Sequence, residues 1–243
     1  SDPEDRRQLV NRALCPAVNR AASMHFGLIV VAVWVLLTAL WYILPTARAD
    51  VYDLLLARTT EKWYAAVLAR LEPDSRLLDV GIGTATALVR NEELVTSRGL
   101  TVIGIDPERE YVTKATRVVV AAGLSDAVKV HCLSIYQPGL RSAFAGKAKF
   151  DAAYFSGSLT VLPDPPAALR CAATMLKPGG KVYVTQTFQN RPAPLTAMLK
   201  PLLRRFTSVD FGRVTYAAEI AQIAEKAGLH VIEDAPVPGS IDT

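Results

Sequence analysis

The chain has 243 residues, of which 51% are hydrophobic and 21% charged, and its formal net charge is +4. This length allows one catalytic domain with a sizeable core and leaves residues to spare. The three cysteines form no Cys-x-x-Cys pair and the three histidines are scattered, which argues against a disulfide framework and against a metal site. The positive charge is spread out, which argues against a nucleic-acid platform.

Residues 1–25 are interpreted as an N-terminal extension, and a transmembrane helix is predicted for 26–44. From Phe26 to Leu44 the chain carries no charge, and twelve of these residues are Leu, Ile, Val or Phe. A helix of that length can cross roughly 30 Å of hydrocarbon. A cleavable signal peptide would have a shorter apolar region, and a core helix would have a polar side, but both remain alternatives. We expect the lipid bilayer to be a partner of this segment.

Residues 45–72 are interpreted as a helical linker. From Ala47 to Leu71 the apolar residues recur at mostly helical spacing, interrupted at Thr59 and Thr60. Three aromatic side chains of this stretch are either pocket or core residues, and core packing is the simpler interpretation: Tyr52, Trp63 and Tyr64.

A glycine-containing turn follows the linker. The run Leu77 to Ala85 passes from apolar residues through Asp79 to Gly81 and Gly83. This pattern predicts a buried strand that turns sharply into a helix, where the glycines let the backbone approach a nucleotide-like ligand. A glycine pair alone is also typical of an ordinary turn.

A second strand strengthens the prediction of a nucleoside pocket. Residues Thr101 to Ile105 form an apolar run that ends on Asp106, 25 residues after Gly81. A carboxylate at this place can reach the two hydroxyls of a ribose. Further on, the segment Leu176 to Gly180 leads into another strand, Lys181 to Thr185.

Together these motifs resemble the class I S-adenosylmethionine-dependent methyltransferases over roughly residues 50 to 238. The resemblance implies an α/β fold with a doubly wound, mostly parallel, Rossmann-like sheet over residues 73–243, here preceded by one transmembrane helix. It also implies S-adenosylmethionine as the cofactor, and helices before the first strand that fold over the cofactor and substrate.

The resemblance further implies roles for individual residues. Asp79, Gly81 and Gly83 would line the methionine and ribose side of the cofactor, and Asp106 would hold the ribose hydroxyls. The adenine ring would lie between Pro107 and Glu108. Two positions depart from the family pattern: Ser134 stands where an acid often meets the adenine, and Ala85 stands where a third glycine is usual.

The acceptor side is expected after the fourth and fifth strands. Ser156 and Ser158 follow the strand Phe150 to Phe155, and they either line the pocket or cap the helix that begins near Pro165. The resemblance makes Ser156 a cofactor contact and Ser158 a substrate contact.

After the fifth strand, Gln186, Thr187 and Tyr216 are further candidate substrate contacts. Candidate bases are His131, Asp210 and Tyr216, none of which is assigned.

The segment 190–216 is where this family varies to select its substrate. Its stretch Leu199 to Phe206 mixes apolar and basic residues, which suits either anionic headgroups or a solvated face. The remainder predicts a helix from Tyr216 to Gly228 and a strand from Leu229 to Val237. No segment is left for the antiparallel edge strand of the family, so either the chain is cut short or the sheet has six strands.

These observations predict a membrane-anchored methyltransferase that acts on a small apolar or amphipathic acceptor, such as a quinone precursor, a lipid or a thiol. The alternative is a methyltransferase-like structural or assembly subunit of a membrane protein complex. Nucleic-acid methylation is disfavoured, because no Asn-Pro-Pro-Tyr type of motif follows the fourth strand. We expect a mitochondrial membrane, because arginine outnumbers lysine and the chain begins at Ser1; endoplasmic reticulum and bacterial inner membrane remain open.

Overall fold

The computed structural model describes residues 59–145, 149–187 and 217–238. Contacts between residues divide the chain into two units, Ser1–Ala47 and Arg48–Thr243, and every described residue lies in the second. The transmembrane helix predicted for Phe26 to Leu44 lies outside the described residues, as does the segment 190–216. Within the described ranges, no helix combines the length and the apolar character that crossing a bilayer requires.

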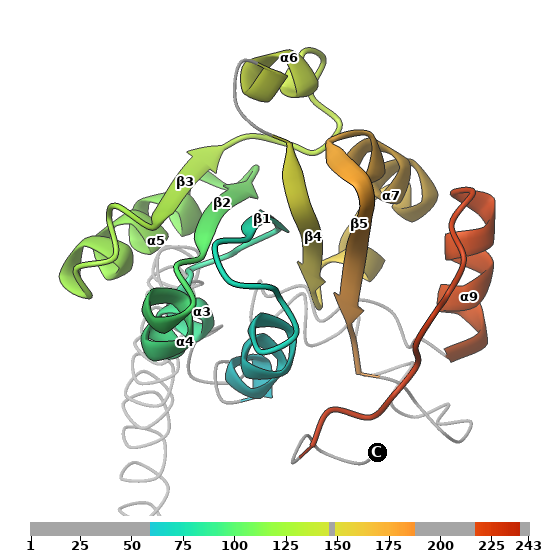
Figure 1. The fold of residues 1–243 in the computed structure, drawn as a ribbon. Helices are drawn as coiled ribbons and strands as arrows, with labels where there is room; N and C mark the ends of the chain where they lie inside the picture. Colours follow the sequence, from blue (N-terminus) through green and yellow to red (C-terminus); the bar gives the residue numbers. More distant parts are fainter. Residues whose placement is uncertain (1–58, 146–148, 188–216, 239–243) are drawn as a thin grey trace, which may run out of the picture. The chain divides into compact units, whose positions relative to one another are not determined.

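Five parallel strands form one sheet in the order β3-β2-β1-β4-β5 (Figure 1). Their bounds are β1 (Arg76–Val80), β2 (Thr101–Asp106), β3 (Val128–Cys132), β4 (Phe150–Ser156) and β5 (Leu176–Thr185). β1, β2 and β4 match strands predicted from the sequence, and β3 matches a strand that the sequence predicts from Val128 to Leu133. β5 contains the predicted strand Lys181 to Thr185 but begins earlier, at Leu176. The chain winds outward from β1 to β3, then returns to the other side of β1. This reversal creates a switch point at the carboxyl ends of β1 and β4, where open α/β sheets bind ligands.

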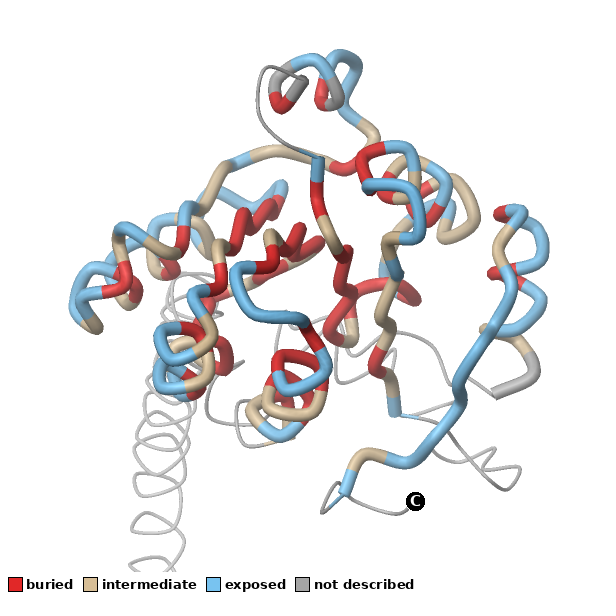
Figure 2. Tube along the Cα trace, viewed as in Figure 1, coloured by how far each residue is buried: buried red, intermediate tan, exposed pale blue. Residues whose placement is uncertain are grey.

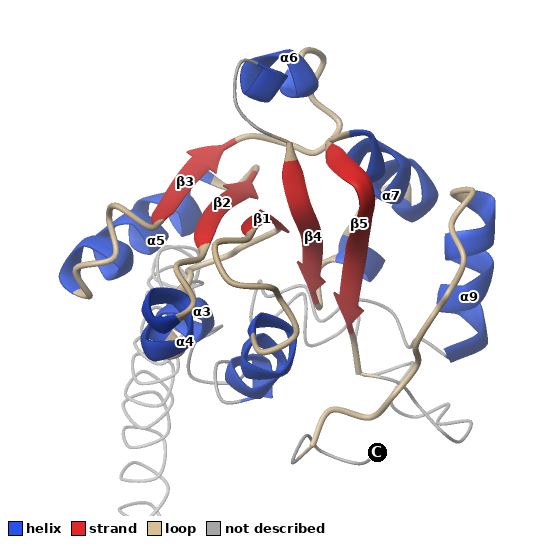
Figure 3. Ribbon diagram, in the orientation of Figure 1, coloured by secondary structure: helices blue, strands red, loops and turns tan. Residues whose placement is uncertain are grey.

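Helices cover both faces of the sheet, so the doubly wound prediction is confirmed (Figure 3). One face is packed by the helical residues 59–68 together with α3 (Thr86–Val89), α4 (Glu92–Ser97) and α5 (Arg109–Ala121). The opposite face is packed by α6 (Leu140–Ala145), η1 (Leu159–Val161), α7 (Pro165–Thr174) and α9 (Ala217–Lys226).

The central strands are buried on both sides, as the run of buried residues in β1, β2 and β4 shows (Figure 2). Successive side chains of a strand point to opposite faces, and Leu77 and Leu78 accordingly belong to the two different core clusters. The same alternation places Asp79, Asp106 and Ser156 on one face, the face that the helical residues 59–68 cover. Three polar residues at adjacent strand ends therefore share one side of the sheet.

The turn after β1 packs directly on β2 through one close contact. A Cβ atom on Gly104 of β2 would lie 2.3 Å from Cδ1 of Ile82 and 3.1 Å from its Cβ. The Ile82 side chain therefore occupies the space that any larger residue at position 104 would need. This contact sets how closely the turn can approach the second strand.

The predicted strand Leu229 to Val237 is wrong, because these residues form no strand. Val231 is 50% exposed and Ile232 is 78% exposed, so these two apolar side chains are not buried. Glu233 and Asp234 interrupt the apolar pattern, and Pro236 lacks the N–H that a sheet ladder needs.

The Gly104→Ala substitution should destabilise the fold by about 1 to 3 kcal/mol, because the added methyl group must displace Ile82 from a packed core. Urea unfolding of the purified protein measures the change. Ile82→Val removes the nearest atom, so the double variant Gly104→Ala with Ile82→Val should lose less stability than the sum of the single variants. Strict additivity would show that this contact does not limit the approach.

Candidate functional site

The turn after β1 alternates between ordinary and left-handed backbone. Gly81 has φ of +77° and Gly83 has φ of +60°. The N–H groups of Gly81 and Ile82 both donate to the carbonyl oxygen of Ile105, at 2.8 Å and 3.2 Å. A Cβ atom at Gly81 would lie 2.6 Å from Cβ of Ser158. The left-handed φ and the lack of room for a side chain thus both require glycine at position 81. The backbone of the turn therefore lies close to the switch point.

Ala85 is the third left-handed residue of this turn, with φ of +57° at the N-terminal cap of α3. A left-handed conformation costs a non-glycine residue roughly 1 to 2 kcal/mol. The resemblance noted in the sequence predicts glycine here, and alanine adopts the left-handed conformation at that cost. Alanine at position 85 in place of the expected glycine therefore does not prevent this turn from forming.

Asp106 ties the turn to the end of β2. Its Oδ2 accepts a hydrogen bond from the N–H of Gly83 at 3.0 Å, and its Oδ1 accepts one from the N–H of Glu108 at 2.9 Å. Burial raises the pKa of Asp106 to about 6, the two amide bonds oppose the rise, and the charge of Glu108 adds to it. Each carboxylate oxygen retains a lone pair that can accept a further hydrogen bond from a ligand hydroxyl.

Asp79 is fully buried beside it. Its Oδ2 accepts a hydrogen bond of 2.6 Å from the hydroxyl of Tyr64, whereas its Oδ1 has no hydrogen-bond partner among the described residues. Burial raises the pKa of Asp79 to about 7; the Tyr64 hydrogen bond lowers it, and repulsion from Asp106 raises it further. The site therefore holds two neighbouring buried acids, and a positively charged group beside them would stabilise their ionised forms.

Ser156 and Ser158 have different environments. The Ser156 Oγ is buried and has no hydrogen-bond partner in the described part of the chain. The Ser158 hydroxyl donates to the carbonyl oxygen of Val80 at 2.5 Å, which fastens η1 to the end of β1. Neither serine caps α7, because Asp164 does so by accepting the Ala167 N–H at 2.9 Å.

The remaining predicted contacts are spread along the carboxyl edge of the sheet. Pro107 is exposed at the end of β2, and Ser134 follows β3, where its Oγ accepts the N–H of Tyr136 at 3.2 Å. Gln186 accepts a hydrogen bond of 3.2 Å from Thr160 of η1, and Thr187 is exposed. Tyr216 lies outside the described residues.

The candidate base His131 does not join the site. Its neighbours Val128 and Val130 pack into the core cluster on the Asp79 face, so the alternation of β3 places His131 on the opposite face. Its ring packs edge-on against Phe144 of α6, with ring centroids 5.8 Å apart. The other candidate, Asp210, lies outside the described residues, as Tyr216 does.

Tyr64, which the sequence leaves as either a pocket or a core residue with core packing as the simpler interpretation, has both roles. It is a core residue, 3% exposed, and it also provides the hydroxyl that contacts Asp79. Its place on the apolar helix face with Val67, Leu68 and Leu71 was a usable signal, because a buried tyrosine hydroxyl usually finds a hydrogen-bond partner.

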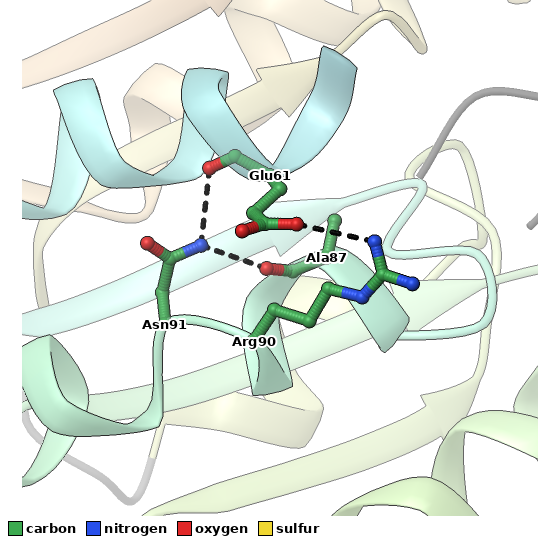
Figure 4. Close-up of polar contacts among 4 residues, drawn as sticks. All are labelled: Glu61, Ala87, Arg90 and Asn91. Carbon is green, nitrogen blue, oxygen red and sulfur yellow. Dashed lines mark hydrogen bonds and ion pairs between the residues drawn. The ribbon is translucent and has the colours of Figure 1, made fainter. Parts of the chain in front are cut away.

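The helix that carries Tyr64 is joined to the residues at the end of α3 by two polar contacts, and a third contact holds the bridging residue Asn91 to α3 (Figure 4). The side-chain amide of Asn91 donates to the carbonyl oxygen of Glu61 at 3.0 Å and to that of Ala87 at 2.8 Å. Arg90 and the Glu61 carboxylate form an ion pair of 3.1 Å. These contacts fix the helical residues 59–68 relative to the turn after β1.

Comparison with known proteins gives one family and several relatives. A family model described as "Methyltransferase domain" matches residues 52–234. The chain is 31% identical over 159 residues to the "Ubiquinone biosynthesis O-methyltransferase" of Ralstonia nicotianae, covering 63% of this chain and 62% of that protein. The chain thus spans about three fifths of the length of that curated relative.

Two solved structures show the likeness in fold. The mitomycin 7-O-methyltransferase MmcR matches with a TM-score of 0.61 at 19% identity, over 83% of this chain and 57% of that one. A methyltransferase from Geobacter sulfurreducens, solved with S-adenosyl-L-homocysteine, matches with a TM-score of 0.51 at 21% identity, over 71% of this chain and 64% of that one.

The Asp79→Asn substitution should stabilise the ligand-free protein at pH 8 by roughly 2 to 4 kcal/mol. The folded-state pKa of Asp79 lies above its unfolded value, so its contribution to stability is fully present below about pH 4 and is lost as the pH rises through about 7. Asparagine keeps an acceptor for Tyr64 and carries no charge.

Urea unfolding of both proteins from pH 4 to pH 8 tests this, with exposed Asp126→Asn as the matched control. The advantage of Asp79→Asn should shrink as the pH falls. Equal stability of the variant and the unmodified protein at pH 8 would contradict the assignment of a costly buried charge to Asp79.

Proposed function

The chain belongs to the methyltransferase-domain family, and on that premise we propose that it is a membrane-anchored enzyme that methylates a small amphipathic acceptor with S-adenosylmethionine. The proposed target atom is a hydroxyl oxygen, and the proposed acceptor is a quinone precursor. The observation that carries the proposal is the pair of buried acids, Asp79 and Asp106, beside a left-handed glycine turn at the switch point of the sheet.

The residues present fit this cofactor. Two buried polar atoms at neighbouring strand ends, Asp79 Oδ1 and Ser156 Oγ, have no hydrogen-bond partner among the described residues. The cofactor carries a sulfonium and an ammonium group, which complement two acids that repel each other. Asp106 would hold the ribose hydroxyls, Asp79 would face the methionine portion, and Gly81 and Gly83 would let backbone approach.

The chemistry asked of the protein is mainly positioning. The bound sulfonium supplies a methyl group that is already activated. The protein then has to hold the acceptor oxygen in line and exclude water, and such positioning can lower the barrier by about 7 to 11 kcal/mol. A hydroxyl acceptor must also lose its proton. His131 lies on the wrong face of the sheet for that step, whereas Asp210 and Tyr216 lie outside the described residues.

Two observations support a quinone-like acceptor. The curated relative is named for O-methylation in ubiquinone biosynthesis, which is the activity of that protein. The apolar segment Phe26 to Leu44, predicted as a membrane span, would keep the domain where molecules with long apolar tails concentrate. On the acceptor side, Gln186 and Thr160 offer a polar pair at the carboxyl end of β5, next to exposed Thr187.

The proposed location is a membrane that faces a compartment supplied with S-adenosylmethionine. A mitochondrial membrane is our first proposal, with endoplasmic reticulum and a bacterial inner membrane as the other two. Subunits of a larger membrane complex are possible partners in each case.

Calorimetry with S-adenosylmethionine on the full chain in detergent should show binding, and Asp106→Ala should weaken it at least tenfold. The substitution removes the proposed acceptor for the ribose hydroxyls. It also removes the hydrogen bond from the Gly83 N–H to Asp106, which fixes the turn after β1. Asp126→Ala, which changes an exposed acid in the turn before β3, is the control and should bind normally.

The same preparation should methylate a catechol with an isoprenoid tail faster than the catechol alone. Absence of heat from the unmodified protein would favour a methyltransferase-like assembly subunit. Binding without transfer to either catechol would point to another acceptor.

The predicted anchor is tested by carbonate extraction of membranes from cells that express the full chain. The apolar residues of 26–44 contribute a favourable insertion free energy on the order of 5 kcal/mol, before the cost of burying polar groups is counted. The protein should therefore stay in the pellet. A variant with Val33→Arg and Val35→Arg in the middle of this segment is the matched control and should move to the supernatant. Release of the unmodified protein would contradict a span.

A further inference from the structure

We propose that Tyr64 is a positioning residue for the cofactor: its hydroxyl occupies one oxygen of Asp79 and turns the other, Oδ1, toward the ligand. This inference rests on the proposed function and adds to it a residue from outside the sheet. Tyr64 lies in the helical residues 59–68, upstream of β1, whereas Asp79 lies within β1.

The contact is short and completely enclosed. Tyr64 is 3% exposed, Asp79 is 0% exposed, and the donor and acceptor oxygens are 2.6 Å apart. A hydrogen bond from a hydroxyl to a carboxylate at this distance is of the strong, charge-assisted kind, and burial increases its strength. Oδ2 is engaged, whereas Oδ1 is buried without a hydrogen-bond partner among the described residues, so it is the oxygen whose bonding a ligand would complete.

The tyrosine is itself held from two sides. Its ring packs edge-on against Tyr154 of β4, with centroids 5.1 Å apart and planes at 87°. Its helix is fastened to α3 through Asn91 and Arg90 (Figure 4). A donor locked by packing and by a second layer of hydrogen bonds can fix the orientation of the group it contacts. Tyr64 therefore presents its hydroxyl to Asp79 before any ligand arrives.

The contact also governs whether Asp79 carries a charge. The groups that face it are the Tyr64 hydroxyl, which stabilises the carboxylate, and the Asp106 carboxylate, which opposes its ionisation. Without the hydroxyl, Asp79 would keep its proton to a higher pH. A protonated acid attracts a cationic ligand far less than a carboxylate does, so loss of the hydroxyl should weaken binding most near neutral pH.

The experiment uses Tyr64→Phe in the full chain, which removes one oxygen and keeps the ring. Its matched control is Tyr154→Phe, because Tyr154 is the buried neighbouring ring and its hydroxyl pairs with Thr185 Oγ1 at 2.8 Å instead. Binding of S-adenosylmethionine is measured by calorimetry at pH 7 and pH 9, in parallel with S-adenosylhomocysteine, which lacks the sulfonium charge.

We expect Tyr64→Phe to weaken S-adenosylmethionine binding about tenfold at pH 7 and about twofold or less at pH 9. Binding of S-adenosylhomocysteine should change less, and Tyr154→Phe should stay within twofold of the unmodified protein at both pH values. On an Asp79→Asn background, Tyr64→Phe should have no further effect. In the ligand-free protein, Tyr64→Phe should move the pH at which stability is lost upward, by urea unfolding between pH 5 and pH 9.

Three results would overturn the proposal. Unchanged binding of S-adenosylmethionine by the Tyr64→Phe variant at pH 7 would show that the Tyr64 hydroxyl does not position the cofactor. An equal loss at pH 7 and pH 9, shared by Tyr154→Phe, would assign the effect to packing. A full effect of Tyr64→Phe on the Asp79→Asn background would show that Tyr64 does not act through Asp79. Failure of the proposed function looks different, because the unmodified protein would then bind no S-adenosylmethionine.

Discussion

The site is organised by the burial of two carboxylates on one face of a parallel sheet. A buried acid needs hydrogen bonds to be tolerated, and each acid here obtains them from a different part of the chain. Asp106 takes backbone amides from the turn after β1 and from the residues after β2. Asp79 takes the Tyr64 hydroxyl from a helix that precedes the sheet. The turn, the second strand and the leading helix are thereby brought to one place.

Much of this arrangement could be predicted from the sequence, because the strongest signals are local. Apolar runs predicted β1 and β2, and the spacing of Gly81, Gly83 and Asp106 predicted the turn and its acid. Other features depend on tertiary contacts. A tyrosine such as Tyr64 has the same helical spacing whether it packs or donates, and nothing near Ser158 in the sequence indicates that its hydroxyl reaches Val80. The strand prediction at Leu229 was wrong because it gave too little weight to Glu233, Asp234 and Pro236, which disfavour pairing in a sheet.

The fold and the specific reaction are separate conclusions, because one fold can serve many chemistries. The family membership and the turn after β1 concern the cofactor half of the site. Ala85 illustrates how far that half tolerates change, since it keeps a left-handed backbone without glycine. In our proposal the acceptor half lies at η1 and the end of β5, where Thr160 and Gln186 form a polar pair.

The hydrogen bonds of the Asn91 side-chain amide restrict which residues can replace it. Both of its hydrogens are committed, one to the carbonyl of Glu61 and one to that of Ala87, and the residue is 9% exposed. Aspartate has the same shape, but it would place a carboxylate oxygen next to those two carbonyl oxygens, which it would repel. Leucine would leave both carbonyl oxygens without a hydrogen-bond donor. Position 91 should thus have a much narrower substitution spectrum in a saturation mutagenesis library than the solvent-exposed positions beside it, although it lies outside the cofactor pocket.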